Sequence, residues 1–212
     1  GLQLAAKKAG TGNKTWVFCG DGDMQEGISH EACSWAGAMK LDGLILVYDS
    51  NGISIEGSTS LTMNDDTKKR FESYGWKVFT CDGHDFDAID RVYRRAMKVT
   101  DAPVLIIATT HIGFGAPTKH DSADSHGAPL GVDNLEKTKQ NLGWEYPPYE
   151  CPQEVFDHCA EAAKAGAEAE IAWKKMFIDY KAAYPELAEE YKTAMAGKMP
   201  DFDIMDELYD FE

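Results

Sequence analysis

Two short polar segments near the start of the chain contain residue types that bind metals and phosphates. The first is Gly20-Asp21-Gly22, and the second contains Asn51, thirty positions after Asp21. Carboxylate and amide oxygens are hard donors, which suit Mg²⁺ or Ca²⁺ better than a softer metal. Such a site is incomplete until a phosphate adds oxygens, and a helix N-terminus after the first segment favours that anion. These residues therefore predict a diphosphate ligand bound through a divalent metal.

Each polar segment follows a run of apolar residues. The runs predict buried parallel strands over residues 16–19 and 44–48, and the glycines beside Asp21 are expected to take strained backbone angles. Between the runs, apolar residues recur at helical spacing, at Ile28, Ala32, Trp35, Ala36 and Met39. They predict an amphipathic helix over residues 27–40 packed on the sheet. Because parallel strands joined by a helix end at the same edge of a sheet, we expect Asp21 and Asn51 to be neighbours.

Strands and helices continue to alternate further along the chain. The sequence predicts strands over residues 77–81 and 104–108 and helices over residues 67–74 and 85–99. We therefore expect an α/β fold in which helices cover a parallel sheet. Residues 109–131 then form a long loop rich in Gly, Pro, Ser and Asp, and loops of this length in compact domains are usually functional or disordered. We favour a functional loop.

The composition changes to Ala, Glu and Lys after the loop. Residues 152–184 predict one or two long surface helices, and another helix begins at Pro185 and ends near residue 196, before an acidic tail over residues 201–212. We expect an α/β domain over residues 1–150 and a helical extension over residues 151–212. The chain already resembles the middle of a helix in its first residues, so we expect it to be a fragment.

Charge and cysteine content exclude several classes of protein. The net charge of −15 argues against a nucleic-acid surface. The five cysteines show no metal-binding spacing, and we expect reduced, mostly buried thiols. We find no signal peptide and no apolar run long enough for a membrane span, so a cytoplasmic setting without a membrane partner is the default expectation.

The polar segments and the long loop resemble one known family. Gly20-Asp21-Gly22 followed by Asn51 resembles the thiamin diphosphate motif. Residues 20–32 (GDGDMQEGISHEA), 109–115 (TTHIGFG) and 125–130 (SHGAPL) are similar to transketolases, in the family's order and spacing. The resemblance implies the thiamin diphosphate-binding fold of the PP type, with thiamin diphosphate and Mg²⁺ as cofactors and Ca²⁺ as a substitute metal. The Gly-rich cofactor segment that transketolases have upstream is absent from this sequence.

The resemblance implies that the cofactor site is built from these two segments. Asp21, Asn51 and the backbone carbonyl of Ile53 match the metal ligands, and the segment Gly20-Asp21-Gly22 and Asn51 match the residues that contact the diphosphate. For Asp21 and Asn51 the alternative is turn formation, which both residue types favour.

The resemblance also implies roles for residues outside the metal site. His126 matches a histidine that hydrogen-bonds the diphosphate near the reacting carbon, and Ile112 matches a residue against the thiazolium ring. For these two the alternatives are a loop cap and an apolar loop anchor. Glu26 and Glu31 match acids at the subunit interface near the cofactor, and the helix dipole alone explains acidic residues in a first helical turn equally well.

Three further residues have no role from the resemblance. His111 and His120 match no functional position, and a surface loop explains them. Asp23 adds a negative charge beside the expected anion site, which opposes diphosphate binding.

The resemblance implies transfer of a two-carbon ketol unit from a ketose phosphate to an aldose phosphate, as in the pentose phosphate pathway. Family members are homodimers, and this chain supplies the diphosphate- and metal-binding half. The pyrimidine-binding domain then comes from a second copy or a complementary chain. Alternatives are a formaldehyde transketolase, a deoxyxylulose phosphate synthase, which Gln25-Glu26-Gly27-Ile28 disfavours, or a non-catalytic interaction module that keeps the fold.

Overall fold

The structure of the chain is a computed structural model, and it describes residues 1–198. The chain divides into two compact units, unit 1 (Gly1–Glu145) and unit 2 (Tyr146–Glu212). The acidic tail expected over residues 201–212 lies outside the described residues. Each unit is described by itself.

Unit 1 is built on a four-stranded sheet with the strand order β1-β2-β6-β5. The strands are β1 (Thr15–Cys19), β2 (Leu44–Ser50), β5 (Lys77–Asp82) and β6 (Val104–Thr109). All three pairings are parallel, and the register places Cys19 opposite Tyr48 and Tyr48 opposite Ile107. The expected parallel sheet is confirmed, and all of its carboxyl ends lie at one edge.

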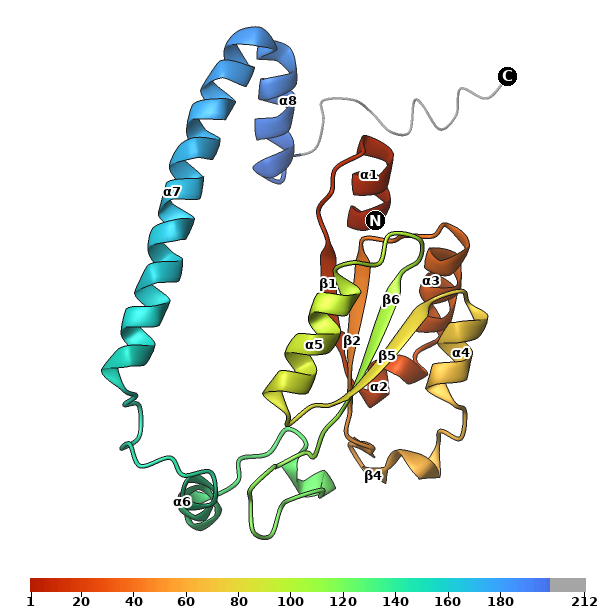
Figure 1. The fold of residues 1–212 in the computed structure, drawn as a ribbon, viewed down its shortest axis with the longest axis vertical. Helices are drawn as coiled ribbons and strands as arrows, with labels where there is room; N and C mark the ends of the chain where they lie inside the picture. Colours follow the sequence, from red (N-terminus) through yellow and green to blue (C-terminus); the bar gives the residue numbers. More distant parts are fainter. Residues whose placement is uncertain (199–212) are drawn as a thin grey trace. The chain divides into compact units, whose positions relative to one another are not determined.

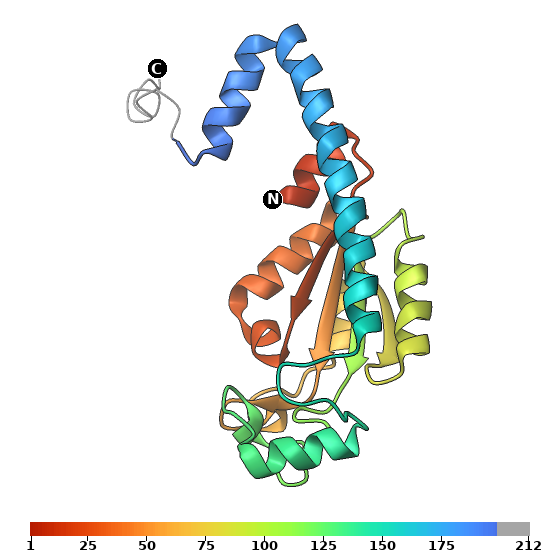
Figure 2. The same ribbon diagram turned by 90° about the vertical axis from the view of Figure 1, so that its left-hand side faces the viewer.

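Helices cover this sheet on both faces. The helices of unit 1 are α1 (Leu2–Ala9), α2 (Asp21–Gln25), α3 (Gly27–Ala38), α4 (Thr67–Ser73), α5 (Phe86–Ala96) and α6 (Val132–Asn141), the last of which follows the loop and does not belong to these covering helices. Figure 2 shows α3 and α5 on opposite sides of the sheet. Smaller elements are the hairpin of β3 (Ile53–Ser54) and β4 (Gly57–Ser58) and the 3₁₀ turns η1 (Thr59–Leu61) and η2 (Ala123–Ser125). The α/β architecture expected from the alternating pattern is thus confirmed, whereas the sequence did not predict α6.

Alternation along β2 creates two hydrophobic cores, because successive strand residues point to opposite faces. Leu46 and Tyr48 belong to a cluster with Phe71 of α4, whereas Ile45 and Val47 belong to a second cluster with side chains of α5. Burying one side chain of this size contributes about 2 kcal/mol. The two cores hold β2 and β6 in the middle of the sheet and so fix the edge where the polar segments begin.

The edge strand β1 is not buried, which makes the sequence-based expectation wrong. Phe18 is 71% exposed and Val17 is 38% exposed. The apolar run of β1 predicted a strand correctly, but hydrophobicity does not reveal whether another element covers that strand. In the described part of the chain, β1 has a neighbour on one side only.

Most of the apolar residues expected to face the sheet from residues 27–40 are also exposed, and of the five only Ala36 is buried. Ile28 is 67% exposed and Trp35 is 48% exposed. The buried residues of α3 are Ala36 and Gly37. A Cβ atom on Gly37 would lie 1.9 Å from the Tyr74 carbonyl oxygen, so the helix approaches its neighbour through its smallest residues. Helical periodicity identified the apolar residues of this helix but not which of them are buried. The close approach of α3 to Tyr74 buries its small residues instead.

The cysteines are all free, and the expectation that most are buried is wrong. Four of them are half-buried and Cys159 is exposed. Cys19 ends the uncovered edge strand, where burial, followed by the charge of nearby acids such as Asp23, raises the pKa of the thiol to about 12. The thiol is therefore neutral at physiological pH.

Unit 2 contains two helices, α7 (Gln153–Ala183) and α8 (Pro185–Met195). The region expected to form one or two long surface helices is a single helix without a buried residue. Trp173 and Phe177 stack with ring centroids 5.1 Å apart, and Tyr191 of α8 lies 5.4 Å from Phe177. These aromatic contacts join α7 to α8. Among residues 1–198, no helix combines the length and apolarity that a bilayer crossing requires.

Candidate functional site at the carboxyl edge of the sheet

The segment Gly20-Asp21-Gly22 begins a short helix instead of forming a strained turn. Asp21 is the first residue of α2, and neither Gly20 nor Gly22 has a positive φ, so the expected strained angles are wrong. The glycines still leave open space. A Cβ atom on Gly22 would meet nothing within 4 Å, and one on Gly20 would meet only Asp23 Oδ2, at 3.9 Å. The backbone is therefore open to close approach by a ligand.

Asp23, which the sequence left unexplained, closes the N-terminus of α2. Its Oδ2 atom accepts a hydrogen bond of 2.8 Å from the Gly20 N–H. A carboxylate at this position is favoured by the helix dipole and uses one of the free N–H groups at the helix start. Asp23 is exposed, so solvent screens much of its charge.

Asp21 connects α2 to the end of β2. The side chain is only 4% exposed. Its Oδ1 atom accepts a hydrogen bond from the Tyr48 hydroxyl, and its Oδ2 atom accepts one of 3.0 Å from the Gly52 N–H. Asn51 precedes Gly52, and its Oδ1 atom accepts a hydrogen bond of 3.0 Å from the Ile53 N–H. The two polar segments therefore meet at one edge of the sheet, as the parallel topology requires.

The charge of Asp21 has no cationic partner among the described residues, although the side chain is buried. Burial of the phenol, together with its hydrogen bond to Asp21, raises the pKa of Tyr48, so the hydroxyl stays neutral and donates. A buried carboxylate with only neutral donors is costly. A cation beside Asp21 and Asn51 would offset that cost. The donors on offer are carboxylate, amide and carbonyl oxygens, and this set fits Mg²⁺ or Ca²⁺.

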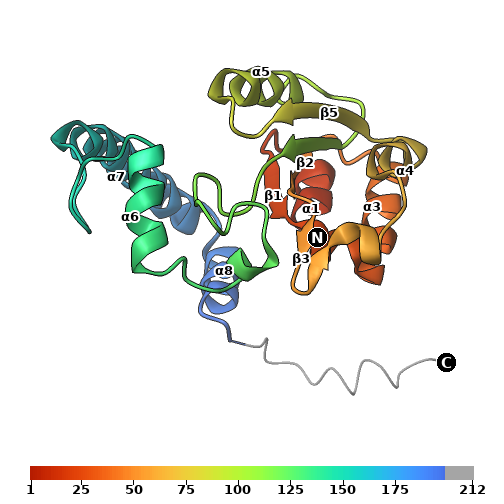
Figure 3. The ribbon, with the colours of Figure 1, turned by 90° about the horizontal axis from the view of Figure 1, so that it is seen from below.

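The loop over residues 109–131 begins at the same edge. The Thr110 N–H donates a hydrogen bond of 3.2 Å to the Ser50 carbonyl, and the Thr110 hydroxyl donates to the Asp49 carboxylate. The start of the loop is thereby fastened to the end of β2, next to Asn51. Figure 1 shows α2, the β3–β4 hairpin and the start of this loop at one end of the sheet, and Figure 3 views that end.

The loop folds back so that Ile112 and His126 belong to segments in contact. Gly113 has φ 64, and a Cβ atom there would lie 2.5 Å from the Lys119 carbonyl oxygen and 2.6 Å from Ser125 Oγ. The residue after Ile112 therefore touches the residue before His126. Ile112 is half-buried, whereas His126 is exposed and its side chain has no hydrogen bond to a described residue. The His126 imidazole is thus available to a ligand.

Among the described residues, the Glu26 and Glu31 side chains make no hydrogen bond to the cofactor-site segments. Both are exposed, and Glu26 lies between α2 and α3 without a side-chain capping bond. The first turn of α3 contains no acidic residue, so the helix-dipole explanation of Glu31 is wrong. Their roles at a subunit interface stay predictions, because no partner chain is present.

The sequence did not predict Tyr48, which hydrogen-bonds Asp21, nor the group formed by His111, His120 and Asp121. A signal for Tyr48 exists in hindsight, because its hydroxyl lies at the end of a strand beside the polar segment. The histidine group had no such signal, since eight residues lie between His111 and His120 and only loop closure brings them together.

Comparison with known proteins agrees with this arrangement. A family model described as "Transketolase, thiamine diphosphate binding domain" matches residues 6–200. The chain belongs to the transketolase family. Transketolase 2 of Vibrio parahaemolyticus is 51% identical over 187 residues, which are 88% of this chain and 28% of the relative. Transketolase 1 of Escherichia coli is 49% identical over 191 residues, which are 89% of this chain and 29% of the relative.

Solved transketolase structures share the fold. The transketolase of Campylobacter jejuni superposes with a TM-score of 0.78 at 43% identity, over 88% of this chain and 30% of that one. A Pichia stipitis transketolase, described as a complex with sedoheptulose-7-phosphate, gives a TM-score of 0.78 at 34% identity, over 94% of this chain and 31% of that one. The chain thus spans less than a third of the length of these transketolases.

Proposed function

We propose that this chain supplies the diphosphate- and metal-binding half of a transketolase. The observation that carries the proposal is the buried, uncompensated carboxylate of Asp21, held beside Asn51 where β1 and β2 end. Membership of the transketolase family supports the same function. Activity of the whole enzyme requires more than this stretch, because the chain matches only 28% of the length of the Vibrio relative.

Mg²⁺ is the metal that we propose, with Ca²⁺ as a substitute. The Asp21 carboxylate, the Asn51 amide oxygen and the Ile53 carbonyl would hold it. Asp21, Asp23 and Asp49 lie close enough to Cys19 to raise the pKa of its thiol further, after the larger effect of burial. This edge is therefore negatively charged, and a diphosphate alone would be repelled. A divalent cation bound between the acidic side chains and the diphosphate would replace this repulsion with attraction.

Thiamin diphosphate is the cofactor that we propose, and when bound it supplies the attacking carbon and the electron sink for carbon–carbon cleavage. Gly20 and Gly22 leave room for the diphosphate, which Asn51 and the His126 imidazole would contact. His126 would transfer protons during the reaction, a role that imidazole side chains often take in catalysis. Ile112 would pack against the apolar part of the cofactor. These residues orient the ligand, and Glu26 and Glu31 face a partner subunit.

The substrates that we propose are a ketose phosphate donor and an aldose phosphate acceptor, as in the pentose phosphate pathway. Related structures from Pichia stipitis are described as complexes with xylulose-5-phosphate, fructose-6-phosphate and sedoheptulose-7-phosphate, all ketose phosphates. Ketol transfer also needs a pyrimidine-binding domain, which a second copy or a complementary chain would contribute. The free cysteines fit a reducing compartment, and the cytoplasm is the one that we propose.

Exposed apolar residues of unit 1 support an association with another chain. Phe18 of β1 is 71% exposed, and Ile28 and Trp35 of α3 are 67% and 48% exposed. Apolar residues gathered on neighbouring elements mark surfaces that another protein covers. A homodimer would bury them.

Calorimetry with thiamin diphosphate tests the proposed site. We expect binding heat with Mg²⁺, none with a chelator, and none with Mg²⁺ in the Asp21→Asn variant. Asp87→Asn is the matched control, because Asp87 is an exposed acid in the first turn of α5 and should leave binding intact. Metal-independent binding, or equal binding by both variants, would contradict the proposal.

Ketol transfer needs a separate experiment. Mixing the chain with the complementary part of a related transketolase, thiamin diphosphate and Mg²⁺ should restore transfer between sugar phosphates. If the folded mixture binds the cofactor but transfers no ketol unit, the chain is a binding module and not half of an enzyme.

A further inference from the structure

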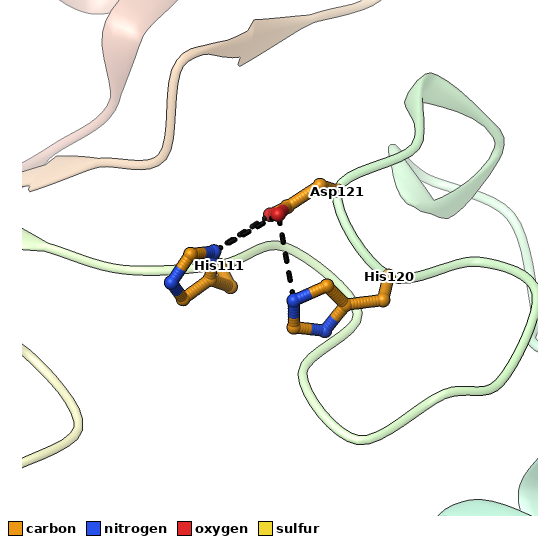
Figure 4. Close-up of side chains that lie close together, drawn as sticks. All are labelled: His111, His120 and Asp121. Atoms are coloured by element: carbon orange, nitrogen blue, oxygen red, sulfur yellow. Dashed lines mark hydrogen bonds and ion pairs between the residues drawn. The ribbon is translucent and has the colours of Figure 1, made fainter.

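The loop after β6 brings two histidines and an aspartate together outside the proposed cofactor site. The Asp121 N–H donates a hydrogen bond of 2.9 Å to the Ile112 carbonyl, so the two ends of this segment lie side by side. Asp121 has φ 53, a left-handed angle that Asp adopts more readily than most residues. As Figure 4 shows, the side chains of His111, His120 and Asp121 then converge on one point.

The nitrogen and oxygen atoms of this group have the spacing of metal ligands. His111 Nδ1 lies 3.0 Å from both carboxylate oxygens of Asp121, and His120 Nε2 lies 3.4 Å from Asp121 Oδ2. The three ligand atoms all lie within 4.8 Å of one another. Ligand atoms around tetrahedral zinc are about 3.3 Å apart, as bonds of about 2.0–2.1 Å require. Small side-chain movements would therefore admit an ion.

Neighbouring rings hold both imidazoles in place. The His111 ring stacks on those of His120 and His84, at centroid distances of 5.0 Å and 5.6 Å. His84 in turn stacks on Phe114 at 3.9 Å, and its Nε2 atom accepts a hydrogen bond of 3.0 Å from the His111 N–H. His84 therefore positions His111, and it does not belong to the group whose ligand atoms lie within 4.8 Å of one another. Ordered ligands lose less freedom when a metal binds.

We propose that His111, His120 and Asp121 form a Zn²⁺ site. Two imidazoles and one carboxylate suit zinc, whereas Mg²⁺ prefers oxygen donors and retains its water. The side chains are 48%, 39% and 46% exposed, so an ion can enter from solvent. Three protein ligands leave a fourth position for water. This group offers nitrogen and oxygen donors, whereas Asp21 and Asn51 offer oxygen donors alone.

The proposed ion fastens the loop. It joins residue 111 at the loop start to residues 120 and 121 in its middle. Ile112 lies directly after one ligand, and Gly113 contacts Ser125, the residue before His126. Zinc at this position therefore restricts the segments that carry Ile112 and His126. The zinc site itself does not depend on the proposed cofactor function.

Cobalt provides the direct test, because tetrahedral Co²⁺ absorbs visible light and occupies zinc sites. We expect the 212-residue chain to bind one Co²⁺ with tetrahedral absorption bands, and we expect Zn²⁺ to displace it while excess Mg²⁺ does not. Absence of these bands in a folded chain, or displacement by Mg²⁺, would overturn the proposal. Far-UV circular dichroism reports whether the chain is folded.

Variants assign the ligands. His120→Ala and Asp121→Asn should each weaken Zn²⁺ binding by about tenfold or more, and Asn tolerates the left-handed angle at position 121. His120→Gln replaces the first variant if that protein does not fold. His158→Ala is the control, because His158 is exposed on α7 and its side chain has no hydrogen bond in the described chain. Unchanged affinity in a folded ligand variant, or an equal loss in the control, would refute the assignment.

Discussion

Gly113 offers a test of how the loop after β6 is held together. Its φ is 64, and a Cβ atom would lie 2.5 Å from the Lys119 carbonyl oxygen and 2.6 Å from Ser125 Oγ. Replacing it with alanine therefore introduces two problems, a left-handed backbone angle and a steric clash. The same substitution at Gly143 tests the backbone angle alone, because Gly143 has φ 67 but nothing lies within 4 Å of its Cβ position.

The expected losses follow from these two causes. An alanine in the left-handed region costs about 1–2 kcal/mol, and this is the whole loss expected for Gly143→Ala. In Gly113→Ala the new carbon also lies closer to a backbone oxygen than real contacts allow, and overpacking typically costs about 1–3 kcal/mol more. We therefore expect the free energy of unfolding to fall by about 2–5 kcal/mol in Gly113→Ala.

Equilibrium urea unfolding of both variants measures the difference, since both glycines belong to unit 1. Local opening of the loop can limit the loss in Gly113→Ala. Limited proteolysis covers that case, because cleavage within residues 109–131 should then be faster in Gly113→Ala than in Gly143→Ala. Equal losses of stability together with equal cleavage rates would refute the close approach of the two loop segments.

Three further changes test other parts of unit 1. Tyr48→Phe removes the donor to the buried Asp21 carboxylate and should cost about 2 kcal/mol in urea unfolding; no loss would mean that this hydrogen bond is unimportant. Asp85→Ala removes the cap that accepts a 3.0 Å bond from the Ala88 N–H and should cost about 1 kcal/mol, measured in the same way. The Cys19 thiol keeps its proton in the folded chain, with a pKa of about 12, but loses it from an ordinary pKa near 9 once unfolded. The free energy of unfolding should therefore fall as pH rises from 9 to 12, with a smaller slope in Cys19→Ala.

The sequence predicted the four sheet strands because each is a short apolar run, and it predicted α3 and α5 because each has apolar residues at helical spacing. It also predicted that the segments containing Asp21 and Asn51 meet, since parallel topology alone brings strand ends together. Asp85, the first residue of a helix that the sequence predicted, caps α5. These features depend on local pattern or on topology, and both are visible in one sequence.

Other features depend on contacts that no local pattern contains. The burial of Ala36 and Gly37 rather than Trp35 depends on how closely α3 approaches Tyr74. The exposure of Phe18 depends on which elements flank β1.

Loop closure set a further limit on prediction. The meeting of His111 with His120 and Asp121 depends on how the loop after β6 folds back. Each histidine taken alone resembled an ordinary surface residue.

The strand order also constrains how unit 1 can fold. β6 lies between β2 and β5, although it is the last of the four strands in the sequence. β5 has no partner in the sheet until β6 is available, so β5 cannot add to the pair formed by β1 and β2. During synthesis β5 therefore has no partner strand, and its edges stay unpaired, until residues 104–109 leave the ribosome. Chaperone contact with the nascent chain is expected to be greatest during that interval.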